Sequence, residues 1–288
     1  MHQQTENICH ISIPLNLDGS RAAVIAAAEE QASSLLQELA KSMDTECLPG
    51  RPVDYQVLLQ CDPGITGKKY LRQGNWIEIH YSPSCIHDNR ESLLFRQCVF
   101  SAITMACFAD GKDFALFHGT FLEENQEEGI LLFGESGIGK STTYRRWLAE
   151  GGCCTADDAL LLFYNDGQFY VRPLPTWSHW LANGNQRIYP VKKAFRVRSM
   201  YWLTRDAERQ QITLAEPARY HCQMLSAMLL HAYGPHRTFS TAEIMEYGEV
   251  TWQFIQRLDR VFPARAFRAH LEYPLKDTLY GGNGNAIG

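Results

Sequence analysis

The chain has 288 residues, of which 45% are apolar and 20% are charged, and its formal net charge is −5. This length and composition are typical of one large globular domain or two modest ones. The negative charge argues against a nucleic-acid partner or a membrane-surface role, because both require a basic footprint. The N-terminus lacks the pattern of a signal peptide, and the most apolar run, Cys98 to Ala109, is too short to span a bilayer. We therefore expect a cytoplasmic protein with neither a nucleic-acid nor a membrane partner.

Nine cysteines occur without a CxxC pair. Their odd number and scattered spacing argue against a disulfide framework and against a zinc ribbon. We expect reduced thiols that pack as small hydrophobic side chains.

Residues 1–111 form an N-terminal α/β lobe in this interpretation, with no catalytic motif and with a role that the sequence leaves open. Ser20 is placed to cap a long amphipathic helix with Ile25, Leu35, Leu36 and Leu39 on one side. The remaining elements expected here are strands at 8–17, 53–60 and 76–81 and a helix at 90–108.

Residues 112–280 show the pattern of a second α/β unit. Two strand-like runs joined by ENQEEG predict a hairpin, and a second hairpin is expected around Asn165, Asp166 and Gly167. Further expected elements are a helix at 140–150, a strand at 195–203, helices at 217–231 and 241–258, and a closing strand in ARAFRAHLEY. Residues 281–288 read as a flexible tail.

The stretch GESGIGKS matches G-x-x-x-x-G-K-[ST] in full, between an expected strand and an expected helix. Glycines let successive backbone N–H groups point at an anion, and the helix N-terminus adds positive potential. Lys140 is expected to reach the terminal phosphates and Ser141 to place its hydroxyl on Mg²⁺. The alternative is a purely structural glycine turn. The predicted nucleotide-binding residues are Gly134, Glu135, Ser136, Gly137, Ile138, Gly139, Lys140, Ser141 and Thr142.

Asp157 and Asp158 follow the helix and precede the run ALLLFY. One carboxylate beside bound phosphates would hold Mg²⁺, and the second would accept the proton of an attacking hydroxyl. Two adjacent carboxylates near phosphates are unfavourable without a cation, so the pair itself favours a metal. The alternative is a solvated turn.

The order His118-Gly119, hairpin, GESGIGKS, helix and TADD resembles the catalytic core of the HPr kinase/phosphorylase family, over about residues 112–175. That family belongs to the phosphoenolpyruvate-carboxykinase-like group of P-loop folds. The resemblance implies ATP and Mg²⁺ as cofactors, with Ser141 and one aspartate, for which Asp157 is the candidate, as metal ligands. Which of Asp157 and Asp158 holds the metal and which is the base stays open. The resemblance also implies Asp158, Asp157, His118 and Lys140 as catalytic residues. Without it, His118 alone would read as a buried structural histidine.

The chain departs from that family after the core, where VRPLPTWSHW stands in place of a glycine-rich, arginine-bearing signature. Phosphorolysis is therefore not expected to carry over. The layout is more similar to the HPr-kinase-related proteins of peptide-modification cassettes of the SynChlorMet type. Family members assemble into rings, which implies a homo-oligomer as one option, and the oligomeric state stays open.

Arg172 and Arg187 are the candidate substrate contacts, since a transferred phosphoryl group needs positive charge around it. The alternative for each is a solvated basic strand face. The function expected is ATP- and Mg²⁺-dependent transfer of the γ-phosphoryl group to a hydroxyl, most readily a Ser or Thr of a peptide or protein. A small hydroxyl compound is the second acceptor class, and a non-catalytic nucleotide-binding accessory protein is the alternative function.

Overall fold

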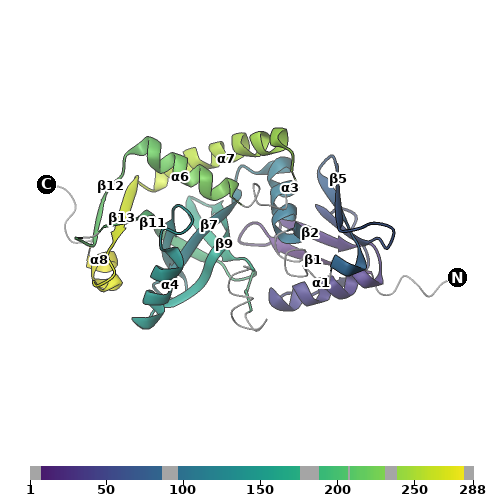
Figure 1. The fold of residues 1–288 in the computed structure, drawn as a ribbon, viewed down its shortest axis with the longest axis horizontal. Helices are drawn as coiled ribbons and strands as arrows, with labels where there is room; N and C mark the ends of the chain where they lie inside the picture. The colour runs from purple at the N-terminus through teal and green to yellow at the C-terminus, as the bar shows by residue number, and fades with distance from the viewer. Residues whose placement is uncertain (1–7, 86–96, 176–187, 207, 231–238, 282–288) are drawn as a thin grey trace.

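Two β-sheets with surrounding helices make up the computed structural model, which describes residues 8–85, 97–175, 188–206, 208–230 and 239–281 (Figure 1). The first sheet uses strands from residues 9–81 and the second uses strands from residues 114–269. The mixed α/β class expected from the sequence is confirmed.

The N-terminal sheet has the strand order β3-β1-β2-β4-β6-β5. Helices α1 and α3 pack on it, and their apolar side chains join the inward residues of the strands in one core. The bounds are β1 Cys9–Pro14, β2 Ala22–Ala27, α1 Glu30–Ser42, β3 Leu48–Pro49, β4 Val57–Cys61, β5 Lys68–Gln73, β6 Trp76–Tyr81 and α3 Phe100–Asp110.

The prediction of a helix that begins at Ser20 is wrong. The chain forms strand β2 after Ser20, and helix α1 begins only at Glu30. Strand β2 lies between β1, with which it pairs antiparallel, and β4, with which it pairs parallel. Pairing on both edges satisfies its backbone groups as a strand, and this outweighs the helix propensity of its alanines. Strand β5 was not expected, and residues 90–96 of the expected 90–108 helix lie outside the described residues.

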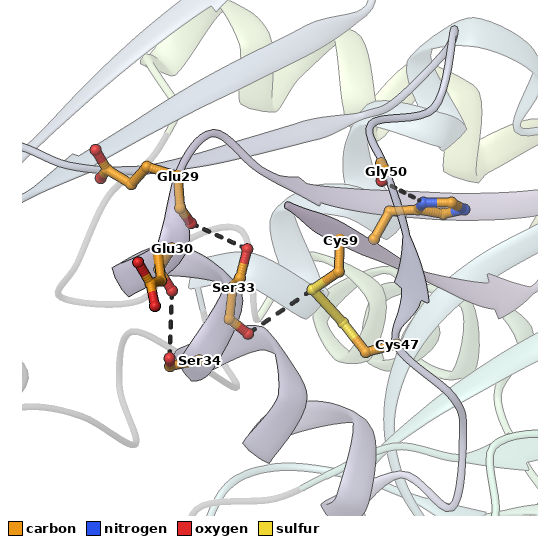
Figure 2. The surroundings of a disulfide bond; sticks show 8 residues. Cys9, Glu29, Glu30, Ser33, Ser34, Cys47 and Gly50 are labelled. Atoms are coloured by element: carbon orange, nitrogen blue, oxygen red, sulfur yellow. Dashed lines mark hydrogen bonds between the residues drawn. A yellow bond between two sulfur atoms is a disulfide. The ribbon is translucent and has the colours of Figure 1, made fainter. Parts of the chain in front are cut away.

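A disulfide joins Cys9, the first residue of β1, to Cys47, which precedes β3 (Figure 2). Their Cα atoms are 5.9 Å apart, within the range that a disulfide spans. The two cysteines meet because β1 pairs with β3, which places Cys9 opposite Pro49. The prediction that every cysteine is a reduced thiol is therefore wrong for this pair; the other seven cysteines lie outside this disulfide.

The second sheet has the strand order β10-β9-β7-β8-β11-β13-β12, and β10 pairs again with the start of β11, so the sheet curls round. Its strands are β7 Phe114–Glu123, β8 Glu128–Phe133, β9 Cys153–Asn165, β10 Gln168–Pro173, β11 Phe195–Arg205, β12 Gln211–Leu214 and β13 Arg265–Ala269. The helices are α4 Lys140–Ala149, α6 Pro217–Leu229, α7 Thr241–Val261 and α8 Leu275–Gly281. Both expected hairpins, β7–β8 and β9–β10, are present.

Helices cover both faces of this sheet. Helices α6 and α7 pack over one face around Phe133, Tyr220 and Phe254, and Figure 1 shows α7 continuing over α3 of the N-terminal part. Helices α4 and α8 cover the other face, where Trp147 and Leu275 are fully buried. Helix α8 was not expected, and residues 282–288 of the expected tail lie outside the described residues. The sheet ends on β12 rather than on β13.

Candidate active site

The loop between β8 and α4 has the backbone shape that the glycine pattern predicts. Gly137 has φ 79° and Gly139 has φ 120°, both in the left-handed region that glycine adopts without steric cost. Gly139 is the N-cap of α4, and the hydroxyl of Thr143 donates to its carbonyl oxygen at 3.0 Å. The loop therefore leads directly into the N-terminus of α4, the arrangement found in sites where backbone N–H groups bind anions.

Lys140 is folded back under the loop that precedes it. Its Nζ donates to the carbonyl oxygens of Gly134 at 2.8 Å and of Glu135 at 3.0 Å, and the residue is 6% exposed. Burial lowers the pKa of Lys140 to about 8, opposed by the negative charges of Asp158 and Asp157. The ammonium group is thus held close to both carboxylates.

Asp157 lies inside strand β9, which begins at Cys153 and runs through both aspartates, so the pair is not in a solvated turn. It pairs in register with Thr120 of β7, and the Thr120 hydroxyl donates to Asp157 Oδ1 at 2.7 Å. Thr120 is fully buried and Asp157 is 2% exposed. One oxygen of this carboxylate therefore has a fixed position.

Asp158 has φ 102°, an unusual backbone conformation for a residue other than glycine. Successive side chains of a regular strand point to opposite faces of the sheet. The turned backbone at Asp158 breaks that alternation, and both aspartates line the same cavity. The structure thus brings the two carboxylates together by a local distortion of β9.

His118 of β7 fixes the position of Asp158. Its Nδ1 lies 2.8 Å from the backbone oxygen of Asp158 and 3.0 Å from its carboxylate Oδ1. Both oxygens only accept, so Nδ1 carries the hydrogen. The next residue, Gly119, lies where β7 passes very close to β8. A Cβ at this position would lie 2.8 Å from the Leu132 carbonyl oxygen, so only glycine fits.

Arg205 is a site residue that the sequence analysis missed. It ends β11, which runs parallel to β8, so the carboxyl end of β11 lies beside the loop that leaves β8. Its guanidinium donates to the carbonyl oxygens of Ile138 at 2.8 Å and of Gly137 at 2.5 Å. These two bonds tie the end of β11 to the glycine loop.

A cavity of about 370 Å³ collects these groups. Most of the predicted site residues line it, whereas Gly134 and Glu135 contribute carbonyl oxygens to Lys140, and Ile138 lines a neighbouring cavity. The cavity is lined by His118, Ser136, Gly137, Gly139, Lys140, Ser141, Thr142, Asp157, Asp158 and Arg205.

The oxygen-rich lining fits a hard cation such as Mg²⁺, because Ser141 and both aspartates meet in one cavity. Among the described residues, no group of three or more His, Cys, Asp or Glu side chains could hold a metal ion alone. Mg²⁺ usually combines one or two carboxylates with phosphate oxygens and water. The donor set therefore fits a cation that binds together with a phosphate ligand.

Arg172 does not reach this cavity. It is 1% exposed, and its guanidinium donates to the carbonyl oxygens of Asn16 at 2.7 Å and of Val191 at 3.3 Å, as well as to Lys192. It ties the β1–β2 turn to the segment before β11. The second candidate, Arg187, lies outside the described residues.

Comparison with known proteins places this site in a family. The family described as SynChlorMet cassette protein ScmC matches residues 87–271, more than half of the chain. The chain belongs to the ScmC family. The matched range contains the loop, both aspartates, His118 and Arg205. The expected relation to SynChlorMet cassette proteins is confirmed.

Other comparisons add little to the ScmC assignment. No curated protein matches the chain. The solved HPr(Ser) kinase/phosphatase from Coxiella burnetii is 20% identical, with 35% of this chain and 77% of that chain covered and a TM-score of 0.24. A similarity at that level carries no argument here. Within the described part of the chain, no helix has the length and apolar character needed to cross a membrane.

Proposed function

We propose that this ScmC-family protein is an ATP- and Mg²⁺-dependent kinase that transfers the γ-phosphoryl group to a hydroxyl, with a Ser or Thr of a peptide or protein as the acceptor. One observation carries the proposal: a single cavity contains a P-loop lysine and two carboxylates that are held in different ways. A protein that only binds nucleotide does not need the second carboxylate.

The loop residues bind the phosphates in this proposal. N–H groups from Ser136 to Thr142 and the N-terminus of α4 face the triphosphate, and Lys140 leaves the loop carbonyls to contact its terminal oxygens. Arg205 adds a second positive charge at the same edge. Together these cations oppose the charge that develops during phosphoryl transfer.

Asp157 and Ser141 are the proposed Mg²⁺ ligands. Asp157 is the more buried of the two aspartates, and the Thr120 hydroxyl keeps one of its oxygens in place, as a fixed ligand requires. When bound, Mg²⁺ supplies positive charge against the β- and γ-phosphate oxygens.

Asp158 is the proposed general base, and His118 is the residue that positions it. The acceptor oxygen attacks the γ-phosphorus, its proton passes to the Asp158 carboxylate, and the bond from the γ-phosphorus to the β–γ bridging oxygen breaks, which releases ADP. Orientation by His118 keeps the carboxylate at one angle to the incoming hydroxyl.

Three further properties of the protein are part of this proposal. They are a phosphoenolpyruvate-carboxykinase-like core in residues 112–280, a cytoplasmic location where ATP is supplied, and a homo-oligomer. A small hydroxyl compound remains the second acceptor class.

Transfer from γ-labelled ATP tests the proposal. The protein is incubated with Mg²⁺ and with Ser- and Thr-containing peptides, and acid-stable label in the peptide is measured. Lys140→Ala should abolish labelling, and Lys112→Ala, a matched change of an exposed lysine in the turn before β7, should not. Labelling by Lys140→Ala at the unaltered rate would overturn the proposal. Nucleotide binding without a labelled acceptor would favour the accessory function.

A further inference from the structure

A second and larger cavity, of about 700 Å³, adjoins the candidate active site. The two cavities share Gly139, Thr142 and Arg205. The larger one lies between α4 and the segment that follows β13, on the side of the loop away from the aspartates. It is lined by Ile138, Gly139, Thr142, Thr143, Arg146, Arg205, Asp206, Ala269, His270, Leu271 and Glu272.

The positions of the reactive groups indicate which end of a bound triphosphate lies in which cavity. His118, Asp157 and Asp158 line only the smaller cavity, so the phosphoryl group that is transferred must lie there. Lys140 and Ser141 belong to the same cavity, and the next residue along α4, Thr142, stands at the junction. The remaining phosphates therefore run past Thr142 towards the larger cavity.

The wall of the larger cavity places an imidazole ring and a large apolar side chain next to each other in sequence, at His270 and Leu271. His270 packs edge-on against Tyr273, with ring centroids 5.0 Å apart, and Arg146 donates to the Tyr273 carbonyl oxygen. This bond ties the segment after β13 to helix α4. Leu271 lines the same cavity and is 73% exposed, so its apolar side chain is open to a bound group.

Asp206, one of the two acidic residues of this cavity, already has partners for its carboxylate. The Asp206 carboxylate accepts from the backbone N–H of Glu208 at 2.9 Å and of Arg209 at 3.3 Å, and it lies 3.6 Å from Arg268. The Asp206 carboxylate thus stabilises the turn that follows it. What the cavity offers instead is volume within the range of small-molecule sites and a mixed apolar and polar lining.

We propose that the larger cavity is the nucleoside subsite: it takes the base and ribose of a nucleoside triphosphate, with the base against His270 and Leu271. This inference rests on the proposed function, because it uses the triphosphate direction that the aspartates define. Arg205, which lines both cavities, stands where the two parts of the nucleotide meet.

Two ligands with the same phosphates and different ends test the subsite. Calorimetry compares the affinity of the full chain for the Mg²⁺ complexes of adenylyl imidodiphosphate and of inorganic tripolyphosphate. The double variant His270→Ala/Leu271→Ala should weaken nucleotide binding about tenfold, the effect of losing roughly 1.4 kcal/mol of contact. Tripolyphosphate binding should not change.

Leu214→Ala is the matched control, since Leu214 is 82% exposed on β12 and lines neither cavity. It should leave both affinities unaltered. Equal loss of both ligands in the double variant, or loss of neither, would overturn the nucleoside subsite while leaving the kinase proposal intact. If the unaltered protein bound neither ligand, the proposed function would fail first, and the subsite with it.

Discussion

Asp158 offers a test of the backbone distortion that brings the two carboxylates together. Its φ of 102° places a residue with a Cβ in a conformation that costs about 1–3 kcal/mol. Glycine adopts that conformation freely, whereas in the interior of an ordinary strand glycine is about 0.5–1 kcal/mol less stable than alanine. At Asp158 the order should invert, so that Asp158→Gly is more stable than Asp158→Ala by about 1–2 kcal/mol.

Urea unfolding of the two variants measures this difference, with the same pair at Asp157 as the control. Asp157 has no positive φ, so Asp157→Gly should be less stable than Asp157→Ala. The same order at both positions would refute the distortion. All four variants should lose phosphoryl transfer.

Three further predictions concern charge, redox state and packing. The pKa of Lys140 is lowered by burial to about 8, so the free protein loses this positive charge as pH rises through that value. Calorimetry at pH 7 and pH 9 should show Mg²⁺–nucleotide affinity about tenfold weaker at pH 9, and equal affinities would contradict it. Reduction of Cys9–Cys47 opens a loop with a sequence separation of 38. It should lower the free energy of unfolding in urea by about 4 kcal/mol, and Cys47→Ser should be insensitive to reductant. Arg172→Met should lower the free energy of unfolding by about 2–3 kcal/mol, because carbonyl oxygens of two chain segments lose a charged donor. Nucleotide affinity should not change. Unaltered stability with weaker nucleotide binding would show instead that Arg172 acts in the active site.

Short-range patterns were enough to predict the central part of the molecule. The hairpin β7–β8, the glycine loop and α4 lie consecutively in sequence, and each follows from local turn and helix chemistry. The grouping of Asp157 and Asp158 with Lys140 and Ser141 in one cavity also needs the pairing of β9 with β7 and the turned backbone at Asp158.

Features that depend on distant strands could not be predicted in this way. Residues Ala22–Ala27 have helical composition and become a strand only because β1 and β4 flank them. Arg205 reaches the loop because β11 lies parallel to β8, more than 60 residues earlier. The expected strand stopped at Leu203; extending it by two residues would have placed this arginine at the end of a strand.

The partners of buried polar side chains could not be predicted from the sequence either. Arg172 was a candidate substrate contact because it lies in the basic cluster after the core, close to the Trp-rich segment. In the structure its guanidinium instead binds carbonyl oxygens where the two sheets meet. Thr120 gave no signal of its own. Its position two residues after His118, on the same face of β7, was the available hint that it too faces an aspartate.

The central claim is that Asp158 acts as the base in phosphoryl transfer at this site. Single-turnover transfer from γ-labelled ATP, measured together with nucleotide affinity on the same Asp158→Asn protein, tests it most directly. Asp166→Asn, the same change in the exposed β9–β10 turn, is the control. We predict a rate lower by about 10²–10⁴-fold with nucleotide affinity retained. Transfer at the unaltered rate by Asp158→Asn would contradict the account.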